Sequence, residues 1–235
     1  MAILRVLFII PAFNAEKNIE KLAVSIIRQT SDEWDAIIID DMSDDNTYDV
    51  ASKFRNDKFT VIKNTEKKYA LRNIVENARH FQDMDDIIVA VIDGDDYLCN
   101  DRTVEILIDE YQKGHDVVWT GHRWDINNLN ISREMPQNVD PYSWPWCSSH
   151  LRTFKADLLN KISDINFKNT SGEWFKRGYD QALMLPVIHV SNSRKYVDEI
   201  CYMYNIESVS IPYRDYEEIS QISTVNIVRS RGFLG

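Results

Sequence analysis

Hydrophobic and polar positions follow two different periods along the first hundred residues. Apolar runs of about four to eight residues are typical of buried strands, whereas apolar residues spaced three and four apart indicate one face of a helix. The runs that predict strands are 3–10, 36–39, 59–62 and 87–92. The stretches with helical spacing lie between them, at 19–27, 50–54 and 71–78. Strands that alternate with helices predict an α/β fold with a mostly parallel central sheet flanked by helices.

Beyond Asp101 the pattern is less regular. Residues 127–149 are rich in Asn, Pro and Trp and show no period, so we expect a long loop there. Around this loop, the spacing predicts a helix over 104–111, a strand over 117–120, a short helix near 179–185 and an aromatic strand over 200–204. The second half is therefore expected to be more irregular than the first.

Composition narrows the class of protein. The 235 residues are 44% hydrophobic and 27% charged, which is ordinary for a globular protein. A net charge of −10 argues against nucleic acid or an anionic membrane surface as the main partner. No apolar stretch approaches the roughly 18–20 residues of a transmembrane helix, and the first residues lead directly into a strand without a signal peptide. Cys99, Cys147 and Cys201 lack the spacing of a zinc site, so we expect a reduced, cytoplasmic protein.

Carboxylates follow two of the predicted strands. Asp93-Gly94-Asp95-Asp96 ends the run 87–92, and Asp40 and Asp41 end the run 36–39. The carboxyl ends of parallel strands meet at one edge of a sheet, where open α/β sheets bind ligands. Crowded carboxylates repel one another unless a cation is present, and Mg²⁺ prefers carboxylates together with phosphate oxygens. A polar turn that caps the next helix remains the alternative interpretation of both clusters.

The first strand ends at the same edge, in Pro11-Ala12-Phe13-Asn14. A carboxylate at Asp41 could accept the imide N–H of a base such as uracil, while Phe13 offers a flat apolar face. Phe13 could equally belong to the core. These residues predict a nucleoside site next to the cation site.

Several short motifs occur in the order and at spacings that resemble family 2 glycosyltransferases with the GT-A fold. They cover roughly residues 3–100, with weaker similarity to about 210. The matching segments are Phe8–Glu16, Ser25–Thr30, Ile38–Asp44, Leu71–Asn73 and Asp93–Asp96, the last of which is similar to the D-x-D segment of the family.

The resemblance implies a single GT-A domain over 1–210, with a nucleotide-binding half (1–100), an acceptor-binding half (101–210) and a C-terminal tail (211–235). It implies transfer of a sugar, with inversion, from a nucleoside-diphosphate sugar to a hydroxyl. The expected donor is a UDP-sugar, and the acceptor a glycan, a lipid-linked glycan or a protein. A homo-oligomer is compatible with the sequence. Arg214, Arg229 and Arg231 of the tail are expected on a solvated surface or at a contact with another subunit or domain.

By the same resemblance, Asp93 and Asp95 would hold Mn²⁺ or Mg²⁺, which neutralises the charge of the departing diphosphate. Arg72 would lie near the base or ribose, and His150 and Arg152 near the diphosphate. Either His150, His189 or neither would supply a further metal or phosphate ligand. The complete set of residues implied for the donor is Pro11, Ala12, Phe13, Glu16, Asp40, Asp41, Arg72, Asp93, Gly94, Asp95, His150 and Arg152.

An acceptor hydroxyl needs a general base because a neutral alcohol is a weak nucleophile. In the family this base is an acidic residue at the start of a helix, and Gly178–Met184 has that form, which implies Asp180. The family more often has Glu-Asp where this chain has Tyr179-Asp180. A helix N-cap is the alternative role for Asp180.

Two other functions are compatible with these features. A sugar-1-phosphate nucleotidyltransferase has a similar sheet and metal site, but it requires a Gly-rich, basic loop after the first strand. Residues 11–16 contain no glycine. A catalytically silent module that binds nucleotide sugars or carbohydrates is the second alternative.

Overall fold

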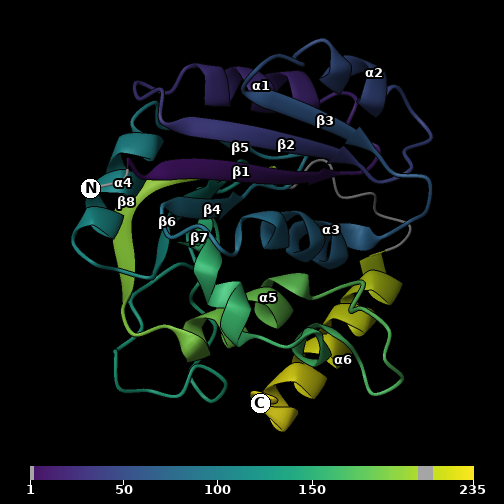
Figure 1. Cartoon of the computed structure of the whole chain (residues 1–235). Helices are drawn as coiled ribbons and strands as arrows, with labels where there is room; N and C mark the ends of the chain where they lie inside the picture. Colours follow the sequence, from purple (N-terminus) through teal and green to yellow (C-terminus); the bar gives the residue numbers. More distant parts are fainter. Residues whose placement is uncertain (1–2, 206–213) are drawn as a thin grey trace.

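The computed structural model describes residues 3–205 and 214–235, with side chains from 219 onward in the second stretch. Within these residues one eight-stranded sheet has the strand order β3-β2-β1-β4-β7-β6-β8-β5 (Figure 1). The strands are β1 (Arg5–Ala12), β2 (Trp34–Asp40), β3 (Phe59–Lys63), β4 (Ile87–Val91), β5 (Tyr97–Leu98), β6 (Val117–Trp124), β7 (Arg152–Lys155) and β8 (Arg194–Tyr204).

The four strands of the first half run parallel, as their apolar pattern predicted. β1 pairs with β2 on one side and β4 on the other, and β2 pairs with β3. The carboxyl ends of β1, β2 and β4 therefore lie at one edge. β7 then pairs antiparallel with both β4 and β6, β6 pairs parallel with β8, and β5 adds antiparallel to β8. The α/β class and the mostly parallel sheet are confirmed, with a mixed second half.

Helices cover both faces of the sheet (Figure 1). The faces have separate apolar cores, one under α3 and α5 and the other under α1 and α4. The α-helices are α1 (Ile19–Ile27), α2 (Thr47–Ser52), α3 (Tyr69–Ala78), α4 (Thr103–Gln112), α5 (Tyr179–Val190) and α6 (Arg214–Arg231), and the short 3₁₀ helices are η1 (Arg79–Phe81), η2 (Ala156–Lys161) and η3 (Asp164–Phe167).

The second half differs from the sequence prediction mainly in the length and number of its elements. The loop over 127–149 is confirmed, since it contains no helix or strand. α5 continues to Val190 through Pro186, which lies more than one turn inside the helix. β8 is eleven residues long rather than five. β7 was not predicted, because its sequence Arg-Thr-Phe-Lys lacks an apolar run.

The C-terminal residues pack against the second half of the domain. Arg229 donates hydrogen bonds to Gln181 Oε1 (2.7 Å) and to the carbonyl oxygens of Tyr142 and Trp144. Arg231 donates to the carbonyl oxygen of Lys168 at 2.5 Å. The expectation of a solvated surface is therefore wrong for these two arginines, because their guanidinium groups bind backbone carbonyls. The side chain of Arg214 lies outside the described residues. In the described part of the chain, no helix combines the length and apolar character needed to span a bilayer.

Candidate active site

The turn after β4 is held tightly against the end of β1. The N–H of Gly94 donates to the carbonyl oxygen of Pro11 at 3.1 Å. A Cβ at position 94 would lie 2.8 Å from both Cα and Cβ of Ala12, so only glycine allows this approach. The close contact brings Asp93 next to the residues that follow β1. The predicted meeting of the two segments at one sheet edge is confirmed.

Asp41 is bound by its own chain on both carboxylate oxygens. Oδ1 accepts hydrogen bonds from Asn64 Nδ2 and the N–H of Lys68, and Oδ2 accepts one from the N–H of Tyr69, all at 2.8 Å. Tyr69 has a φ of 62°, a left-handed conformation that is costly for a bulky residue. Burial would raise the pKa of Asp41, but the hydrogen bonds outweigh it and hold the pKa below its ordinary value. Asp41 is therefore a fixed negative charge.

Lys67 lies over the neighbouring aromatic ring. Its ammonium group is 2.8 Å from the ring centroid of Phe13, 2.9 Å from the carbonyl oxygen of Asp41 and 3.6 Å from Asp41 Oδ2. Phe13 is 49% exposed, so it does not belong to the core. The aromatic ring of Phe13 is therefore exposed, with a cation on one face.

Asp93 is bound from the opposite side of the edge. Arg152 Nη2 donates to Asp93 Oδ2 at 3.2 Å and to the hydroxyl of Tyr179 at 2.9 Å, and the Tyr179 hydroxyl donates to Asp93 Oδ1. Arg152 is 1% exposed. Burial would lower the pKa of Arg152, but Tyr179 and the carboxylates of Asp93 and Asp180 raise it, so the guanidinium remains charged.

Asp93 also belongs to a cluster of atoms that could coordinate a metal ion. Among the described residues, oxygen or nitrogen atoms of Asp93, Asp96 and His150 lie within 4.8 Å of one another. His150 Nδ1 is 4.0 Å from Asp93 Oδ2 and has no hydrogen-bond partner among the described residues. Burial, with the charge of Arg152, lowers the pKa of His150 well below its ordinary value, so the imidazole is neutral. A neutral imidazole with an unused nitrogen beside two carboxyl groups fits a divalent cation such as Mn²⁺.

Asp96 is the carboxyl group of this cluster that the sequence did not single out. It is 1% exposed, and it accepts hydrogen bonds from the Tyr202 hydroxyl (2.6 Å) and the N–H of Asn205 (2.7 Å). Burial, followed by the charges of Asp95 and Asp93, raises the pKa of Asp96 well above its ordinary value. Asp95, the predicted metal ligand, is outside the cluster, and its backbone carbonyl accepts from Asn205 Nδ2 at 3.2 Å.

Asp180 lies in the first turn of α5, two residues after the left-handed Gly178 (φ 63°). Gly178 packs against α6, because a Cβ there would lie 3.0 Å from the carbonyl oxygen of Gln221. Burial raises the pKa of Asp180 above its ordinary value, although the nearby Arg152 opposes this. Gly178 occupies the N-cap position of α5, and Asp180 is the second residue of the helix.

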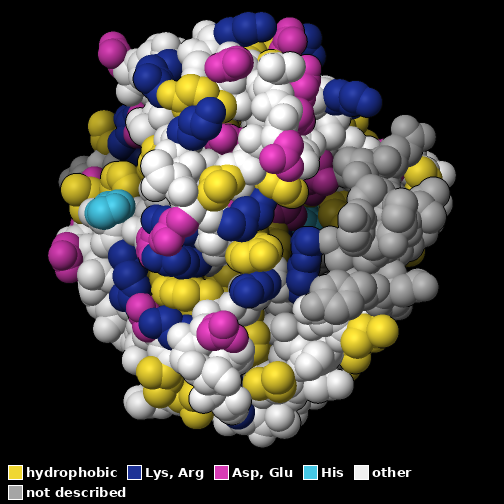
Figure 2. Space-filling model, turned by 90° about the vertical axis from the view of Figure 1, so that its right-hand side faces the viewer, with side chains coloured by type: hydrophobic (Ala, Val, Ile, Leu, Met, Phe, Trp, Pro, Cys, Tyr) yellow, Lys and Arg dark blue, Asp and Glu magenta, His cyan; other side chains and the backbone are white. Residues whose placement is uncertain are grey.

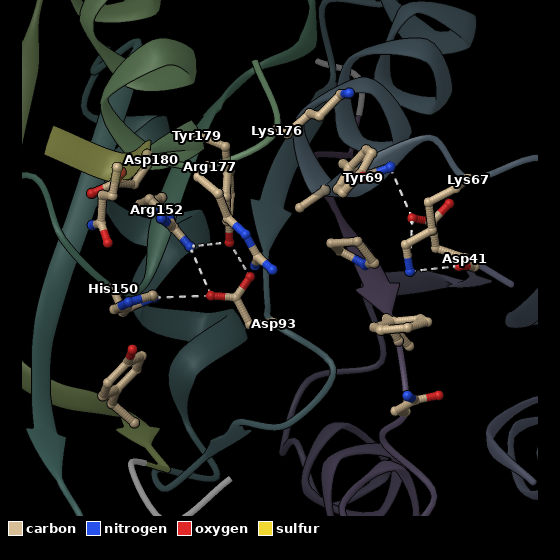
Figure 3. Close-up of a pocket in the computed structure, with 18 residues that line it drawn as sticks. Asp41, Lys67, Tyr69, Asp93, His150, Arg152, Lys176, Arg177, Tyr179 and Asp180 are labelled. Atoms are coloured by element: carbon tan, nitrogen blue, oxygen red, sulfur yellow. Dashed lines mark hydrogen bonds and ion pairs between the residues drawn. The ribbon is translucent and has the colours of Figure 1, made fainter. Parts of the chain in front are cut away.

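These groups share one open cavity of about 820 Å³. One end, here the Asp41 end, contains Phe13, Asp41, Lys67 and Tyr69, and the other, the Asp93 end, contains Asp93, His150, Arg152, Tyr179 and Asp180 (Figure 3). Lys and Arg side chains stand around a hollow on this face of the molecule, with acidic side chains deeper inside (Figure 2). The predicted residues that line the cavity are Pro11, Ala12, Phe13, Asp41, Asp93, His150, Arg152 and Asp180.

Other predicted residues lie near the cavity without lining it. Asp40 is fully buried, with one oxygen 3.3 Å from the N–H of Ser43, and Gly94 acts through its close packing on β1. Glu16 accepts hydrogen bonds from Asn46. Arg72 forms ion pairs with Glu76 (2.7 Å) and Glu66 (3.1 Å) on the surface of α3.

His189 is far along α5 from Asp180, where its ring stacks on Phe233 with the centroids 4.6 Å apart. Of the two histidines considered as a further ligand, only His150 belongs to the cluster around Asp93.

Sequence reasoning missed several side chains of the cavity. They are Lys67, Tyr69, Lys176, Arg177, Tyr204 and Gln221, and Tyr179 was noted only as a departure from the family pattern. None of them is an acidic residue directly after an apolar strand, which was the signal used to find the acidic clusters. The only indication in the sequence that any of them might line the site was that Lys176 and Arg177 directly precede Gly178–Met184, the segment that implied Asp180.

The parallel half-sheet, the acidic edge and the shared cavity define a GT-A-type α/β fold, and solved structures support this assignment. TarS 1–349 of Staphylococcus aureus in complex with UDP superposes with a TM-score of 0.63 over 94% of this chain and 65% of that chain, at 21% identity. A mannosyltransferase from Pyrobaculum calidifontis in complex with GDP-Man and Mn²⁺ gives a TM-score of 0.57 over 95% of this chain and 64% of that chain, at 15% identity.

The sequence places the chain within a family. The family model described as "Glycosyl transferase family 2" matches residues 7–181, and the chain belongs to this family. It is 28% identical to chondroitin synthase of Escherichia coli over 94% of this chain and 32% of that protein. It is 24% identical to the E. coli UDP-Glc:alpha-D-GlcNAc-diphosphoundecaprenol beta-1,3-glucosyltransferase WfgD over 91% of this chain and 81% of that protein. The chain thus spans about a third of the first relative and most of the second.

Proposed function

We propose that this protein transfers a sugar from a nucleoside-diphosphate sugar to an acceptor hydroxyl, with inversion at the anomeric carbon. The observation that carries the proposal is the single cavity that joins the Asp41 end to the Asp93 end, with Asp180 facing the same space. Family membership supports the activity, and relatives named as a chondroitin synthase and a glucosyltransferase support a glycan or lipid-linked glycan as the acceptor. A protein acceptor is a further possibility that the acceptor assays below would reveal.

The two ends of the cavity suit the two ends of such a donor. At the Asp41 end, Phe13 offers its ring to the base. Asp41 Oδ2 accepts a hydrogen bond from Tyr69, and a carboxylate oxygen can accept a second one. An acceptor oxygen at this position favours a base with an N–H in its ring, such as uracil. A solved complex of TarS with UDP-GlcNAc supports a UDP-sugar as the donor. The half formed by residues 1–100 is thus proposed to bind the nucleotide, and residues 101–210 the acceptor.

A divalent cation is part of the proposal. Asp93, Asp96 and His150 would hold it, and when bound it would supply Lewis-acid stabilisation of the diphosphate. Binding of the cation requires Asp96 to lose its proton, which the cation's own charge favours. Arg152 and Tyr179 already bind Asp93 and keep its carboxylate oriented within the cavity.

Asp180 is the proposed general base. The acceptor oxygen forms a bond to the anomeric carbon as the bond from that carbon to the diphosphate oxygen breaks, and the electron pair of the broken bond leaves with the diphosphate. The hydroxyl proton moves to the carboxylate of Asp180. Burial raises the pKa of Asp180 above its ordinary value, which makes its carboxylate a stronger base than that of an exposed aspartate.

A screen of nucleotide sugars tests the proposal. We expect one nucleotide sugar to raise the melting temperature of the full chain, and the rise to be larger with Mn²⁺ than with EDTA. Incubation with that donor and with glycan, lipid-linked and peptide acceptors should then release the nucleoside diphosphate only when an acceptor is present. Binding without release under all these conditions would identify a silent binding module instead. Formation of pyrophosphate from UTP and a sugar 1-phosphate would identify a nucleotidyltransferase.

A further inference from the structure

A turn directly after β6, formed by residues 125–131 and called here the apolar turn, carries three aliphatic side chains. Ile126, Leu129 and Ile131 are 58%, 42% and 38% exposed, although a turn of this kind usually carries polar residues. The N–H of Trp124 donates to the carbonyl oxygen of Leu129 at 3.1 Å and closes the turn. The backbone is thus fixed by its own hydrogen bond, and the turn presents its aliphatic side chains to solvent.

Both ends of the apolar turn are bound to residues that line the cavity. At its start, the N–H of Asp125 donates to the carbonyl oxygen of Tyr204 at 3.0 Å. Directly after its end, the hydroxyl of Ser132 donates to the carbonyl oxygen of His150 at 3.3 Å. Tyr204 and His150 both line the cavity. The apolar turn is therefore continuous with the wall of the candidate active site.

A row of aromatic rings leads from the cavity to the apolar turn. The ring of Tyr204 stacks on His150 with the centroids 5.1 Å apart, and the ring of Trp124 lies 5.9 Å from that of Tyr204. β4 and β6 both pair antiparallel with β7, so both strands end at the sheet edge that holds the cavity. Since only β7 separates them, their ends lie about 10 Å apart across the sheet. A sugar with its linkage to a longer molecule can span such a distance.

We propose that the apolar turn binds the aliphatic chain of a lipid-linked acceptor. This inference rests on the proposed function, in which residues 101–210 bind the acceptor and Asp180 takes the proton from its hydroxyl. The sugar that carries this hydroxyl lies beside Asp180, and the acceptor continues past Tyr204 and Trp124 to the turn. Contact between the chain and the three aliphatic side chains removes apolar surface of both partners from water. A free glycan has no comparable aliphatic surface, so the turn favours a lipid-linked acceptor over a free glycan.

Pairs of glycosides that differ only in their aliphatic chain test this inference. Methyl and octyl β-glycosides of glucose, galactose and N-acetylglucosamine are titrated calorimetrically into the full chain with UDP and Mn²⁺, below the concentration at which the octyl compounds form micelles. We expect an octyl glycoside to bind at least about tenfold more tightly than its methyl partner, which requires burial of only about two methylene groups. In I126S/L129S, which changes two exposed side chains, the two members of this pair should bind within about twofold of each other. The affinity for the methyl glycoside should not change.

A matched control changes two exposed apolar side chains elsewhere. Ile27 ends α1 and Met84 precedes β4, so both lie near the other edge of the sheet, where β2 and β4 begin. I27S/M84S should keep the wild-type preference for the octyl chain.

Three results would overturn the inference. The first is wild-type protein that binds neither member of any pair, or binds both equally. The second is an unchanged octyl preference in I126S/L129S. The third is binding of the wild type, but not of I126S/L129S, to phosphatidylcholine vesicles without an octyl preference, which would make the turn a membrane contact instead. If no nucleotide sugar binds the wild type, the proposed function fails, and the glycoside pairs without UDP still test the turn.

Discussion

The two ends of the cavity contain carboxylates in opposite states. At the Asp41 end, the chain donates three hydrogen bonds to Asp41, and these hold its pKa low. At the Asp93 end, burial dominates and raises the pKa of both Asp96 and Asp180. Asp41, whose carboxylate oxygens are mostly occupied by hydrogen bonds from the chain, contributes to the stability of the fold and to recognition of the ligand. A buried carboxyl with a raised pKa is available to exchange a proton or bind a cation.

The side-chain nitrogen atoms of the two ends differ in the same way as the carboxylates. At the Asp41 end, the ammonium of Lys67 lies on Phe13 and binds the carbonyl of Asp41. At the Asp93 end, His150 Nδ1 is buried and has no hydrogen-bond partner in the part of the chain that the structure describes. The first end is therefore stabilised before any ligand binds, whereas the second retains unused ligand atoms. Substitutions at the two ends should separate stability from catalysis.

The largest effect is expected at Asp180. Replacing it with asparagine keeps the shape but removes the base, so kcat should fall by about 10²–10⁴-fold while donor affinity changes little. The measurement is steady-state kinetics together with a donor titration. D109N, which changes an exposed carboxylate on α4, is the matched control and should retain full activity. Transfer at the wild-type rate by D180N would assign the base to another residue.

The same residue gives a pH dependence. Asp180 acts as a base only when ionised, and burial raises its pKa above the ordinary value. As the pH falls through that raised pKa, kcat should decrease, with an apparent midpoint above the roughly 3.9 of a free aspartate. A pH profile of kcat over the range in which the protein stays folded measures this midpoint. A profile that stays flat down to the unfolding pH would contradict the role of Asp180.

The next largest effect is expected at Asp93. D93N keeps a hydrogen-bond acceptor for Arg152 but removes the charge shared with the cation, so Mn²⁺ affinity should fall by at least about 10–100-fold. Manganese titration followed by the thermal shift of the protein measures this affinity. D57N, at an exposed position near β3, should bind Mn²⁺ like the wild type. Equal Mn²⁺ affinity in D93N and wild type would exclude Asp93 as a ligand.

Much of the Asp41 end could be predicted from the sequence, because it follows parallel strands. An apolar run followed by Asp identifies the end of a buried strand, and parallel strands place their ends together. Asp41 and Phe13 were found in this way. Lys67 and Tyr69 were not, because neither follows an apolar strand. Lys67 lies between β3 and α3, and Tyr69 is the first residue of α3, where its N–H donates to Asp41.

The Asp93 end was less predictable for a physical reason. It depends on β7, whose polar sequence hides a strand that brings Arg152 beside Asp93. The sequence of Asp93–Asp96 does not indicate which of its carboxyl groups lie beside His150, and among the described residues Asp93 and Asp96 form the cluster with it. Asp180 was found only through family resemblance, since a carboxylate at the start of a helix is also the usual pattern of a cap.

A stability effect is expected at Asp41. In D41N, an NH₂ group replaces one of the oxygens that now accept N–H groups, and the free energy of unfolding at pH 7 should fall by about 1–3 kcal/mol. Because the folded-state pKa of Asp41 is lowered, its contribution is complete above the unfolded pKa of about 3.9 and is lost as the pH falls through the folded value. Urea unfolding at several pH values should show the difference shrinking toward low pH. A difference that grows at low pH would contradict the ionised carboxylate.

The smallest effect is expected at Arg72, the residue that resemblance assigns to the base or ribose. Its guanidinium pairs with Glu66 and Glu76 on the surface of α3, and such pairs contribute about 0.2–1 kcal/mol to stability. R72Q should therefore change UDP affinity by less than about twofold, within the small free-energy range of a surface pair. K67M, which removes an ammonium from the cavity itself, should weaken UDP binding more strongly in the same titration. If R72Q weakens UDP binding more than K67M, Arg72 must leave its two glutamates to contact the nucleotide, and the Asp41 end would then rearrange on binding.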